Sequence, residues 1–329
     1  MSFLVIFVNR YGRLRSGWRA SVFAALFIIL ATILAFSANI ALTVLGVSLT
    51  DAVPRQTIFI LSSLILFLTA ILIGWICARG LEGLPLKSLG WSYLRGKWWR
   101  DLFFGIVFGM ISLLLATGVA ALGGGLKFTF NQTTEQGAII KTVLFSAIIF
   151  AFGAAGEEAL FRGYPVQTFV RANLAWVAIV LTSVFFAFVH AQNPNVTAFG
   201  LINTALAGVW FVVAYLKTRN LWFPFGMHWA WNWTMAAICG LPVSGITDLT
   251  PDPVWRGIDT GPVWLTGGHY GLEGGAACTI ALVVSMIMIW FAPFLRPTAE
   301  MLTLTSQENP RSIHNSKLNL TDSAGDFKP

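Results

Sequence analysis

Polar and charged side chains recur at helical spacing inside segments that are otherwise apolar. They form three short pieces: Glu157-Glu158-x-x-x-Arg162, Phe186-x-x-x-His190 and His228-x-x-x-Asn232. A charged group at bilayer depth costs about 2.5–3.5 kcal/mol on insertion scales, so its presence in such a segment indicates a function. Carboxylates and imidazoles can activate a water molecule, and amide and imidazole donors can stabilise an oxyanion. The three pieces together predict hydrolysis of a bond inside a membrane.

The first piece contains two adjacent carboxylates that cannot share one task, because neighbours on a helix point about 100° apart. Glu158 and Arg162 are four residues apart and lie on one helix face. We expect Arg162 to reach Glu158 and hold it ionised. Glu157 then faces elsewhere, without that close partner, and is the candidate general base. The alternative is that the group serves only as a buried ion-pair anchor.

The second piece brings a histidine to the depth of Glu157. If the chain turns near residues 171–173, Glu157 lies about 15 residues before the turn and His190 about 18 after it. At about 1.5 Å per residue, both lie roughly 22–27 Å along an antiparallel pair of helices. Phe186, four residues before His190, is expected to pack beside the site, with ordinary core packing as the alternative.

The third piece supplies hydrogen-bond donors from one helix face, because His228 and Asn232 are four residues apart. An imidazole and an amide aimed at one point form an oxyanion hole, which is worth about 2.7–4 kcal/mol for each donor. The alternative is hydrogen bonding between membrane helices.

A metal centre is a second interpretation of the same groups. Glu157, His190 and His228 would make a His₂Glu zinc site. The motif His-Glu-x-x-His is absent, however, and the same atoms can hold a water molecule without a metal. We expect no required cofactor, with zinc as the alternative. The three cysteines have no ligand spacing and are expected to be small buried hydrophobes: Cys77, Cys239 and Cys278.

The composition indicates that this chain lies in a lipid bilayer rather than in water. Of 329 residues, 56% are hydrophobic and only 11% are charged, whereas soluble domains carry about 25% charged residues. The chain is therefore expected to be an all-α polytopic membrane protein in contact with the lipid bilayer. The net charge of +7 falls in short loops between apolar segments. It is expected to set topology rather than to bind nucleic acid.

About eight transmembrane helices are expected around a buried polar cavity. Their approximate ranges are 20–47, 57–78, 102–123, 138–161, 174–190, 197–216, 223–241 and 275–295. The first range is too long for the apolar region of a signal peptide and is expected to span the membrane. With both termini cytoplasmic, most Lys and Arg residues lie on the cytoplasmic side, as the positive-inside rule requires. The basic residues expected on the outer side are Arg55, Lys127, Lys141 and Arg256.

The predicted organisation divides the chain into six segments. A basic cytoplasmic N-terminus (1–19) precedes N-terminal helices with an interfacial loop (20–137), a catalytic core (138–241), an outer loop (242–274), the last transmembrane helix (275–296) and a polar, disordered tail (297–329). The loop 79–101 is expected to lie at the head groups through Trp91, Tyr93, Trp98 and Trp99. The outer loop is expected to cap helix ends, with a substrate lid as the alternative. His269 and His314 receive no role.

The three pieces, in this order and on consecutive helices, resemble the CAAX-protease and bacteriocin-processing family, abbreviated CPBP and also called Abi. This family includes the type II CAAX prenyl endopeptidases. Each piece alone is a weak signal, but the ordered set in a polytopic chain is specific, and it covers about residues 138–241. The resemblance implies an all-α membrane fold with the site in a cavity between helices. It also implies a glutamate-dependent intramembrane endopeptidase, although many members are labelled metalloproteases.

The resemblance assigns roles that agree with the helix-face argument. It implies that Glu157 is the base, that His190 helps to hold the attacking water, and that His228 and Asn232 stabilise the tetrahedral oxyanion. The residues that support them are Glu158, Arg162 and Phe186.

The leading functional hypothesis is an endopeptidase acting on a membrane-associated protein or peptide, with prenylated and lipid-anchored substrates included. The alternative is a non-enzymatic scaffold or bacteriocin-immunity protein that uses the same residues structurally. A third hypothesis is a proton-coupled transporter in which Glu157 and His190 form a relay. The expected location is the plasma membrane of a bacterium.

Overall fold

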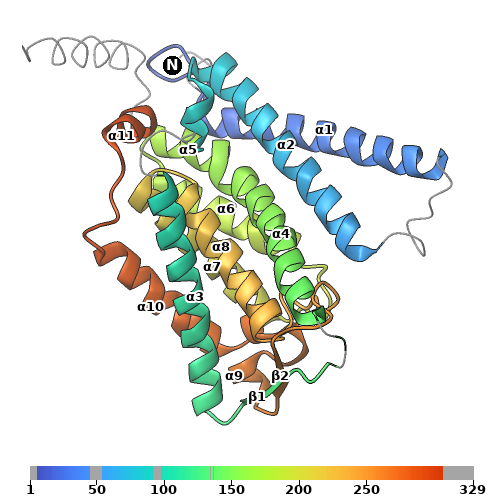
Figure 1. Cartoon of the computed structure of the whole chain (residues 1–329). Helices are drawn as coiled ribbons and strands as arrows, with labels where there is room; N and C mark the ends of the chain where they lie inside the picture. Colours follow the sequence, from blue (N-terminus) through green and yellow to red (C-terminus); the bar gives the residue numbers. More distant parts are fainter. Residues whose placement is uncertain (1–5, 45–53, 92–97, 134, 136, 307–329) are drawn as a thin grey trace, which may run out of the picture.

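The protein folds into a bundle of long helices capped at one end by irregular chain (Figure 1). The structure, a computed structural model, describes residues 6–44, 54–91, 98–133, 135 and 137–306. The helices that form the bundle are α1 (Ser16–Val44), α2 (Arg55–Glu82), α3 (Trp98–Leu122), α4 (Ala138–Glu158), α5 (Tyr164–Arg171), α6 (Ala175–Val189), α7 (Ala198–Thr218), α8 (Trp222–Trp233) and α10 (Ala276–Phe291). This confirms the predicted all-α membrane class, apart from one two-stranded sheet.

Among the residues that the structure describes, five helical runs are long and apolar enough to cross a membrane: α1, α2, α3, residues 138–171 and α7. The helices α6 and α10 are apolar but shorter. Each predicted span overlaps an observed helix, and the fourth is longer than predicted. Here α4 continues through a π-helical segment, η3 (Ala159–Gly163), into α5, giving a run of 34 residues.

Pro165 lies in the first turn of α5, where a proline is tolerated because its missing N–H has no helical partner. Gly163, the last residue of the π segment, has a non-helical backbone (ψ −122°), so helical geometry is interrupted directly before α5. The run ends at Arg171, and Asn173 adopts a left-handed conformation (φ 59°) before α6 begins at Ala175. The predicted turn near residues 171–173 is therefore confirmed, with α4–α5 and α6 lying on either side of it.

The predicted outer loop is a folded cap. Strand β2 (Trp255–Asp259) pairs antiparallel with β1 (Leu126–Phe130), which follows α3, so that Leu126 lies opposite Asp259. The helix α9 (Val263–Thr266) and two 3₁₀ turns, η5 (Gly268–Tyr270) and η6 (Leu272–Gly274), complete the cap. The strand pair was not predicted, because its two five-residue strands lie far apart in the sequence.

The segment predicted to lie at the head groups is only partly exposed. Trp91 is 5% exposed, and its ring meets that of Trp222 edge-on at a centroid distance of 5.0 Å. Trp98 also packs on Trp222, whereas Trp99 is exposed. The interfacial prediction was therefore wrong for Trp91, which becomes core because α8 offers aromatic neighbours. Tyr93 lies outside the described residues.

The start of the C-terminal tail is ordered rather than disordered. The helix α11 (Ala299–Ser306) buries Met301, Leu304 and Thr305, and Glu300 pairs with Lys87 of the 3₁₀ segment η2 (Leu86–Leu89). The prediction of disorder was therefore wrong for residues 299–306, where apolar residues at helical spacing find a surface to cover. The rest of the tail, including His314, lies outside the described residues.

A buried ion cluster joins three helices at the N-terminal end of α1. Arg171 donates from Nε and Nη2 to the two carboxylate oxygens of Glu82, both at 2.8 Å. Nη1 of Arg19 lies 2.7 Å from Oε2 of the same carboxylate. All three side chains are almost fully buried. Arg19 and Arg171 fasten α1 and α5 to α2, a structural role that the sequence did not predict.

Replacement of Arg171 by Gln is expected to lower the free energy of unfolding by about 3–5 kcal/mol, because it leaves the Glu82 carboxylate buried with reduced compensation. The matched control is Arg55→Gln, since Arg55 pairs with Asp248 at 2.6 Å but is 82% exposed. Exposed pairs contribute about 0–1 kcal/mol. Thermal unfolding of both variants in detergent measures the difference, and equal shifts would contradict a structural role for the cluster.

The helices α3 and α8 pack through glycines at very close range. A Cβ atom added to Gly105 would lie 2.3 Å from the carbonyl oxygen of Phe223, and one added to Gly109 would lie 2.3 Å from that of Met227. From the other side, a Cβ on Gly226 would lie 2.6 Å from the carbonyl oxygen of Leu102. Small residues allow membrane helices to approach in this way. The position of α8, which carries His228, is therefore fixed by backbone contact with α3.

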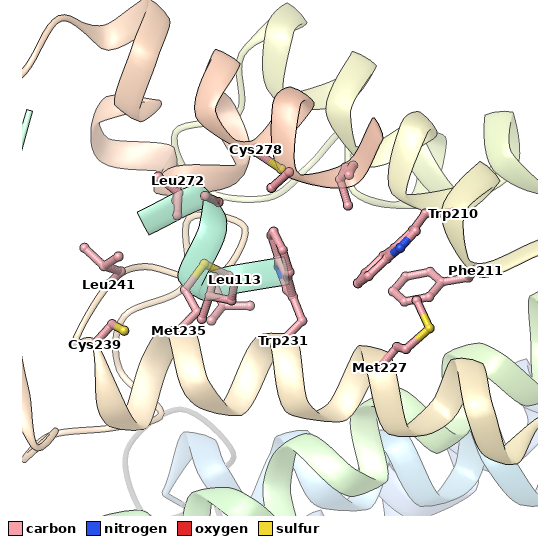
Figure 2. Packing of buried hydrophobic residues seen from close by; sticks show 14 of the residues in the cluster. Leu113, Trp210, Phe211, Met227, Trp231, Met235, Cys239, Leu241, Leu272 and Cys278 are labelled. Atoms are coloured by element: carbon pink, nitrogen blue, oxygen red, sulfur yellow. The ribbon is translucent and has the colours of Figure 1, made fainter. Parts of the chain in front are cut away.

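Apolar side chains from α3, α7, α8 and α10 fill the space around this contact. Figure 2 shows Trp231 of α8 projecting toward Cys278 of α10, with Trp210 and Phe211 of α7 beside it. The cysteines Cys77, Cys239 and Cys278 are all free and buried, as predicted.

Candidate active site

The two adjacent glutamates end α4 and point in different directions. Glu158 is fully buried, and its Oε1 accepts a hydrogen bond from Nη1 of Arg162 at 3.2 Å. Arg162 lies in the π segment η3 and also donates to the carbonyl oxygen of Gly208 at 3.4 Å. The structure thus joins Glu158 and Arg162 as their spacing predicted, and it leaves Glu157 on a different face.

Aromatic rings surround the guanidinium group of Arg162, whose side chain is fully buried. Its Cζ lies 4.4 Å from the ring centroid of Phe186 and 4.8 Å from that of Phe211. A desolvated cation over an aromatic face gains about 2 kcal/mol or more. These contacts, together with Glu158, compensate for the burial of the charge. Phe186 packs beside the site, as predicted, and its partner there is Arg162 as well as His190.

His228 lies between the two carboxylates. Its Nδ1 is 2.9 Å from Oε1 of Glu158, and its Nε2 is 3.7 Å from Oε2 of Glu157, which exceeds hydrogen-bond distance. The ring stacks on Phe211 with a centroid separation of 4.6 Å and an interplanar angle of 23°. Since an ionised carboxylate only accepts, Glu158 holds the proton on Nδ1 and turns Nε2 toward Glu157.

Spacing within each helix did not predict the contacts of His228 with the two glutamates. Nδ1 of His228 is engaged by Glu158, and its Nε2 lies near Glu157. Both contacts have one cause: α8 packs against α4, a tertiary contact that spacing within each helix cannot reveal.

His190 is the first residue after α6, where it caps the helix C-terminus. Its Nδ1 lies 2.7 Å from the carbonyl oxygen of Phe186, and its ring packs on the Phe186 ring at a centroid distance of 4.7 Å. Because a carbonyl oxygen only accepts, Nδ1 carries a proton. In the neutral imidazole Nε2 is then an acceptor, which is the form that can hold a water molecule by its proton.

A cavity of about 80 Å³ connects these groups. Its lining includes all four side chains predicted to be catalytic: Glu157, His190, His228 and Asn232. One water molecule needs about 10–15 Å³ of such space, so the cavity holds several. The Glu157 side chain is 26% exposed, although its Oε2 atom is buried. The three pieces of sequence therefore converge on one wettable pocket.

Comparison with known proteins identifies the segment that carries this pocket. Residues 139–234 match the family described as type II CAAX prenyl endopeptidase Rce1-like. This helical core is similar to the Rce1-like family. The match begins at the second residue of α4 and ends just after α8, so it contains all four candidate catalytic residues. No curated protein and no solved structure matches the chain.

The similarity to the Rce1-like family supports CAAX-type protease activity in general, and the long apolar helices indicate an integral membrane protein. The family predicted from the three pieces is confirmed. The helices α1–α3, the cap and α10 lie outside the matched segment, and they hold the Rce1-like core in place through contacts such as the α3–α8 packing.

Sequence reasoning missed Glu273, a cavity-lining residue outside the Rce1-like core. Its Oε2 accepts hydrogen bonds from the backbone N–H of Ser244 at 2.6 Å and from the Ser244 hydroxyl at 2.7 Å. Its Oε1 accepts from Nε1 of Trp231 at 3.1 Å, and Trp231 directly precedes Asn232 on α8. Glu273 therefore ties two parts of the cap to α8. In the sequence, Glu273 is a carboxylate shortly before the apolar segment that forms α10, and that position could have identified it.

Asn203 was also missed. Its buried amide donates to the carbonyl oxygens of Glu273 at 2.8 Å and Gly275 at 2.9 Å, and it accepts from the Thr279 hydroxyl at 2.7 Å. An asparagine in an apolar helix is a recognisable signal for such interhelical bonding. This residue fixes the start of α7 to the cap beside the pocket.

The second interpretation of these groups was a zinc centre. Within the part of the chain that the structure describes, no three His, Cys, Asp or Glu side chains are arranged to hold a metal ion. The set considered from sequence, Glu157, His190 and His228, therefore lines one pocket without forming a ligand cluster. His269 is exposed in the cap and lies apart from these residues.

Proposed function

We propose that this protein is an intramembrane endopeptidase that hydrolyses a peptide bond of a membrane-associated protein or peptide through water activated by Glu157 and His190. The observation that carries the proposal is the convergence of Glu157, His190, His228 and Asn232 on one cavity. The family description names prenyl endopeptidases, so prenylated and lipid-anchored chains belong to the substrate class under test.

The reaction begins with a water molecule that transfers one proton to the Glu157 carboxylate, while its other O–H stays intact and donates a hydrogen bond to Nε2 of His190. The water oxygen then attacks the carbonyl carbon of the scissile bond. The proton on Glu157 passes to the leaving nitrogen as the C–N bond breaks, which restores the carboxylate. Glu157 thus acts first as a base and then as an acid, and no atom is left unbalanced.

The negative oxygen of the tetrahedral intermediate needs donors. The Asn232 amide supplies one, and Nε2 of His228 supplies another when the imidazole carries both protons. Glu158 holds Nδ1 of this ring at 2.9 Å, which fixes the direction of Nε2. Arg162 in turn holds Glu158. These two buried residues act through His228 and position it.

The substrate can be found by comparing membrane proteomes. Cells that carry Glu157→Ala in place of the wild-type protein are expected to accumulate intact forms of one or a few membrane peptides, because removing the base stops cleavage. Mass spectrometry of membrane fractions measures the ratio of uncut to cut peptide. Identical ratios at equal protein abundance would contradict the proposed activity.

Removal of metal ions tests whether side chains of the protein or a bound metal ion activate the water molecule. We expect peptide hydrolysis to survive chelation and repurification in metal-free buffer, because the proposed base and donors belong to the protein. The rate before and after treatment is the measurement. Loss of activity that returns on adding Zn²⁺ would instead support the zinc interpretation of Glu157, His190 and His228.

The orientation proposed for the chain places both termini in the cytoplasm, in agreement with the distribution of basic residues. Arginine and lysine lie near the start of α1, the end of α2, the start of α3 and the end of α7. These ends all belong to the same end of the bundle, where the N-terminus and α11 lie (Figure 1). The plasma membrane remains the predicted location.

A further inference from the structure

We propose that Glu273 is a specificity-determining residue of the candidate active site, and that it selects substrates with a lysine or arginine side chain close to the scissile bond. The proposal rests on the proposed function and narrows its substrate class by charge. Glu273 lies in the 3₁₀ turn η6 of the cap, outside the segment that is similar to the Rce1-like family.

The cavity lining carries negative charge that the protein does not balance. Glu157 and Glu273 both line the cavity, and no lysine or arginine is found in its lining among the described residues. Arg162 lies outside this lining, and its guanidinium group pairs with Glu158. That arginine therefore offsets the carboxylate it contacts, and the two carboxylates of the lining keep their charge.

The two histidines of the lining do not cancel this charge. His190 is neutral when its Nε2 accepts a hydrogen bond from water, as the proposed mechanism requires. His228 carries a positive charge only when both of its ring nitrogens are protonated, and that charge offsets one carboxylate of the two. The cavity is therefore negative in either protonation state of His228, and it favours a cationic group of the substrate.

Glu273 has the contacts of an ionised carboxylate. Its Oε1 accepts from the indole N–H of Trp231, and its Oε2 accepts from the backbone N–H and the hydroxyl of Ser244. Among the described residues, Glu273 forms no ion pair. A carboxylate has about four acceptor positions, so Oε1 can accept one more hydrogen bond. Removing a charge from water is costly unless the charge is paired, so this half-buried carboxylate indicates a cationic ligand.

The backbone around Ser244 fixes the direction of the Glu273 carboxylate. Val243 and Ile246 exchange backbone hydrogen bonds of 3.0 and 2.8 Å across a tight turn. The residues between them both have positive φ, 48° at Ser244 and 83° at Gly245, as a type I′ turn requires. A serine seldom adopts this conformation, and here it brings two donors to Oε2. The carboxylate is thus oriented before a substrate arrives, which lowers the entropic cost of binding.

A structural role alone does not account for the charge. Tying the cap to α8 requires acceptor atoms, and an uncharged amide oxygen would also accept from Trp231. The carboxylate adds a negative charge in the cavity that is proposed to hold the scissile bond. Among the side chains of a peptide, lysine and arginine carry the permanent positive charge that forms a charge-assisted hydrogen bond with it.

Reporter peptides that differ in one charge test the proposal. The probes are anchored in proteoliposomes by a prenylated cysteine and have blocked chain ends. They carry Lys, Met or Glu at one position near the cleavable bond, and every position on either side is tried in turn. Methionine resembles lysine in length but lacks its charge. The purified full-length protein is compared with Glu273→Gln, with Glu157→Gln as the blank, and kcat/KM is measured for each peptide.

We expect one position at which the wild type cleaves the Lys peptide about ten- to a hundredfold more efficiently than the Met peptide, the contribution of one hydrogen bond to a charged group. The Glu peptide should be cleaved least efficiently. Glu273→Gln should bring the three kcat/KM values together. Because each ratio compares two peptides on one preparation, it does not depend on the fraction of enzyme that is folded.

Two further variants separate the charge from the structural contacts. Ser244→Ala removes one donor to Oε2 but keeps the carboxylate, so the preference for Lys over Met should be retained. If Glu273→Gln does not fold, Glu273→Asp replaces it, and its shorter side chain should lower the preference. Equal kcat/KM for the Lys and Met peptides at every position overturns the proposal, as does a preference that Glu273→Gln or Glu273→Asp leaves unchanged.

A binding experiment separates this proposal from the proposed function. The same peptides are N-methylated at the cleavable bond, which prevents hydrolysis, and their Kd values are measured with the wild type and with Glu273→Gln. Tighter binding of the Lys peptide that Glu273→Gln abolishes supports the proposal, and equal Kd values contradict it. Charge-dependent binding without cleavage of any reporter would contradict the proposed function alone. Equal cleavage and equal binding of all reporters would contradict only the role of Glu273.

Discussion

Glu157→Gln is expected to lower the rate of peptide hydrolysis by at least about 10²–10⁴-fold, the contribution of a positioned general base. The amide keeps the size of the side chain but cannot take a proton from water. Because Oε2 of Glu157 lies 3.7 Å from Nε2 of His228, beyond hydrogen-bond distance, the substitution breaks no direct bond between them. Folding should therefore be preserved, with Tm and abundance close to wild type. The measurement is single-turnover cleavage by purified protein.

The control for this prediction is Glu300→Gln, which alters an exposed carboxylate on α11 that pairs with Lys87. Its hydrolysis rate is expected to match that of the wild type. Wild-type cleavage by Glu157→Gln would show that the base has been misassigned. Full rescue of a cellular phenotype by Glu157→Ala at normal abundance would favour the scaffold or immunity alternative over an enzyme.

Gly109→Ala is expected to damage both folding and activity, although it adds only one methyl group. The new Cβ would lie 2.3 Å from the carbonyl oxygen of Met227, so α3 and α8 must separate. Overpacking of this kind costs about 1–3 kcal/mol. His228 directly follows Met227, and a displacement of about 1 Å at a catalytic group can cost about 10²-fold in rate. Thermal unfolding and hydrolysis rate measure the two effects.

The matched control is Gly118→Ala on the same helix, where an added Cβ meets nothing within 4 Å. There the substitution should be neutral or stabilising by up to about 1 kcal/mol, because alanine favours helix. Equal behaviour of the two variants would show that the α3–α8 contact does not position His228.

The parts of the fold that could be predicted from the sequence depend on the spacing of residues that are close together in the chain. Long apolar stretches predicted the membrane helices, and the four-residue interval between Glu158 and Arg162 predicted their contact. A single turn between two helices was enough to bring Glu157 and His190 to one pocket. In each of these cases the interacting groups are related by helix geometry or by one short connection.

The parts that could not be predicted depend on contacts between distant segments. Glu82 meets Arg19 and Arg171 only after three helices have packed, and no periodic pattern links the three positions. Glu273 reaches the pocket because the cap folds back over α8. Two short strands 125 and more residues apart, such as Lys127 opposite Ile258, leave no local trace of their pairing either.

The run from Ala138 to Arg171 carries Glu157 and Glu158 in its first part and Arg171, a partner of Glu82, at its end. One residue inserted or deleted between Arg162 and Arg171 would turn everything beyond it by about 100°. Arg171 would then swing away from Glu82 while Glu157 stayed in place. Selection on this stretch should consequently tolerate many exchanges of side chain but almost no change in its length.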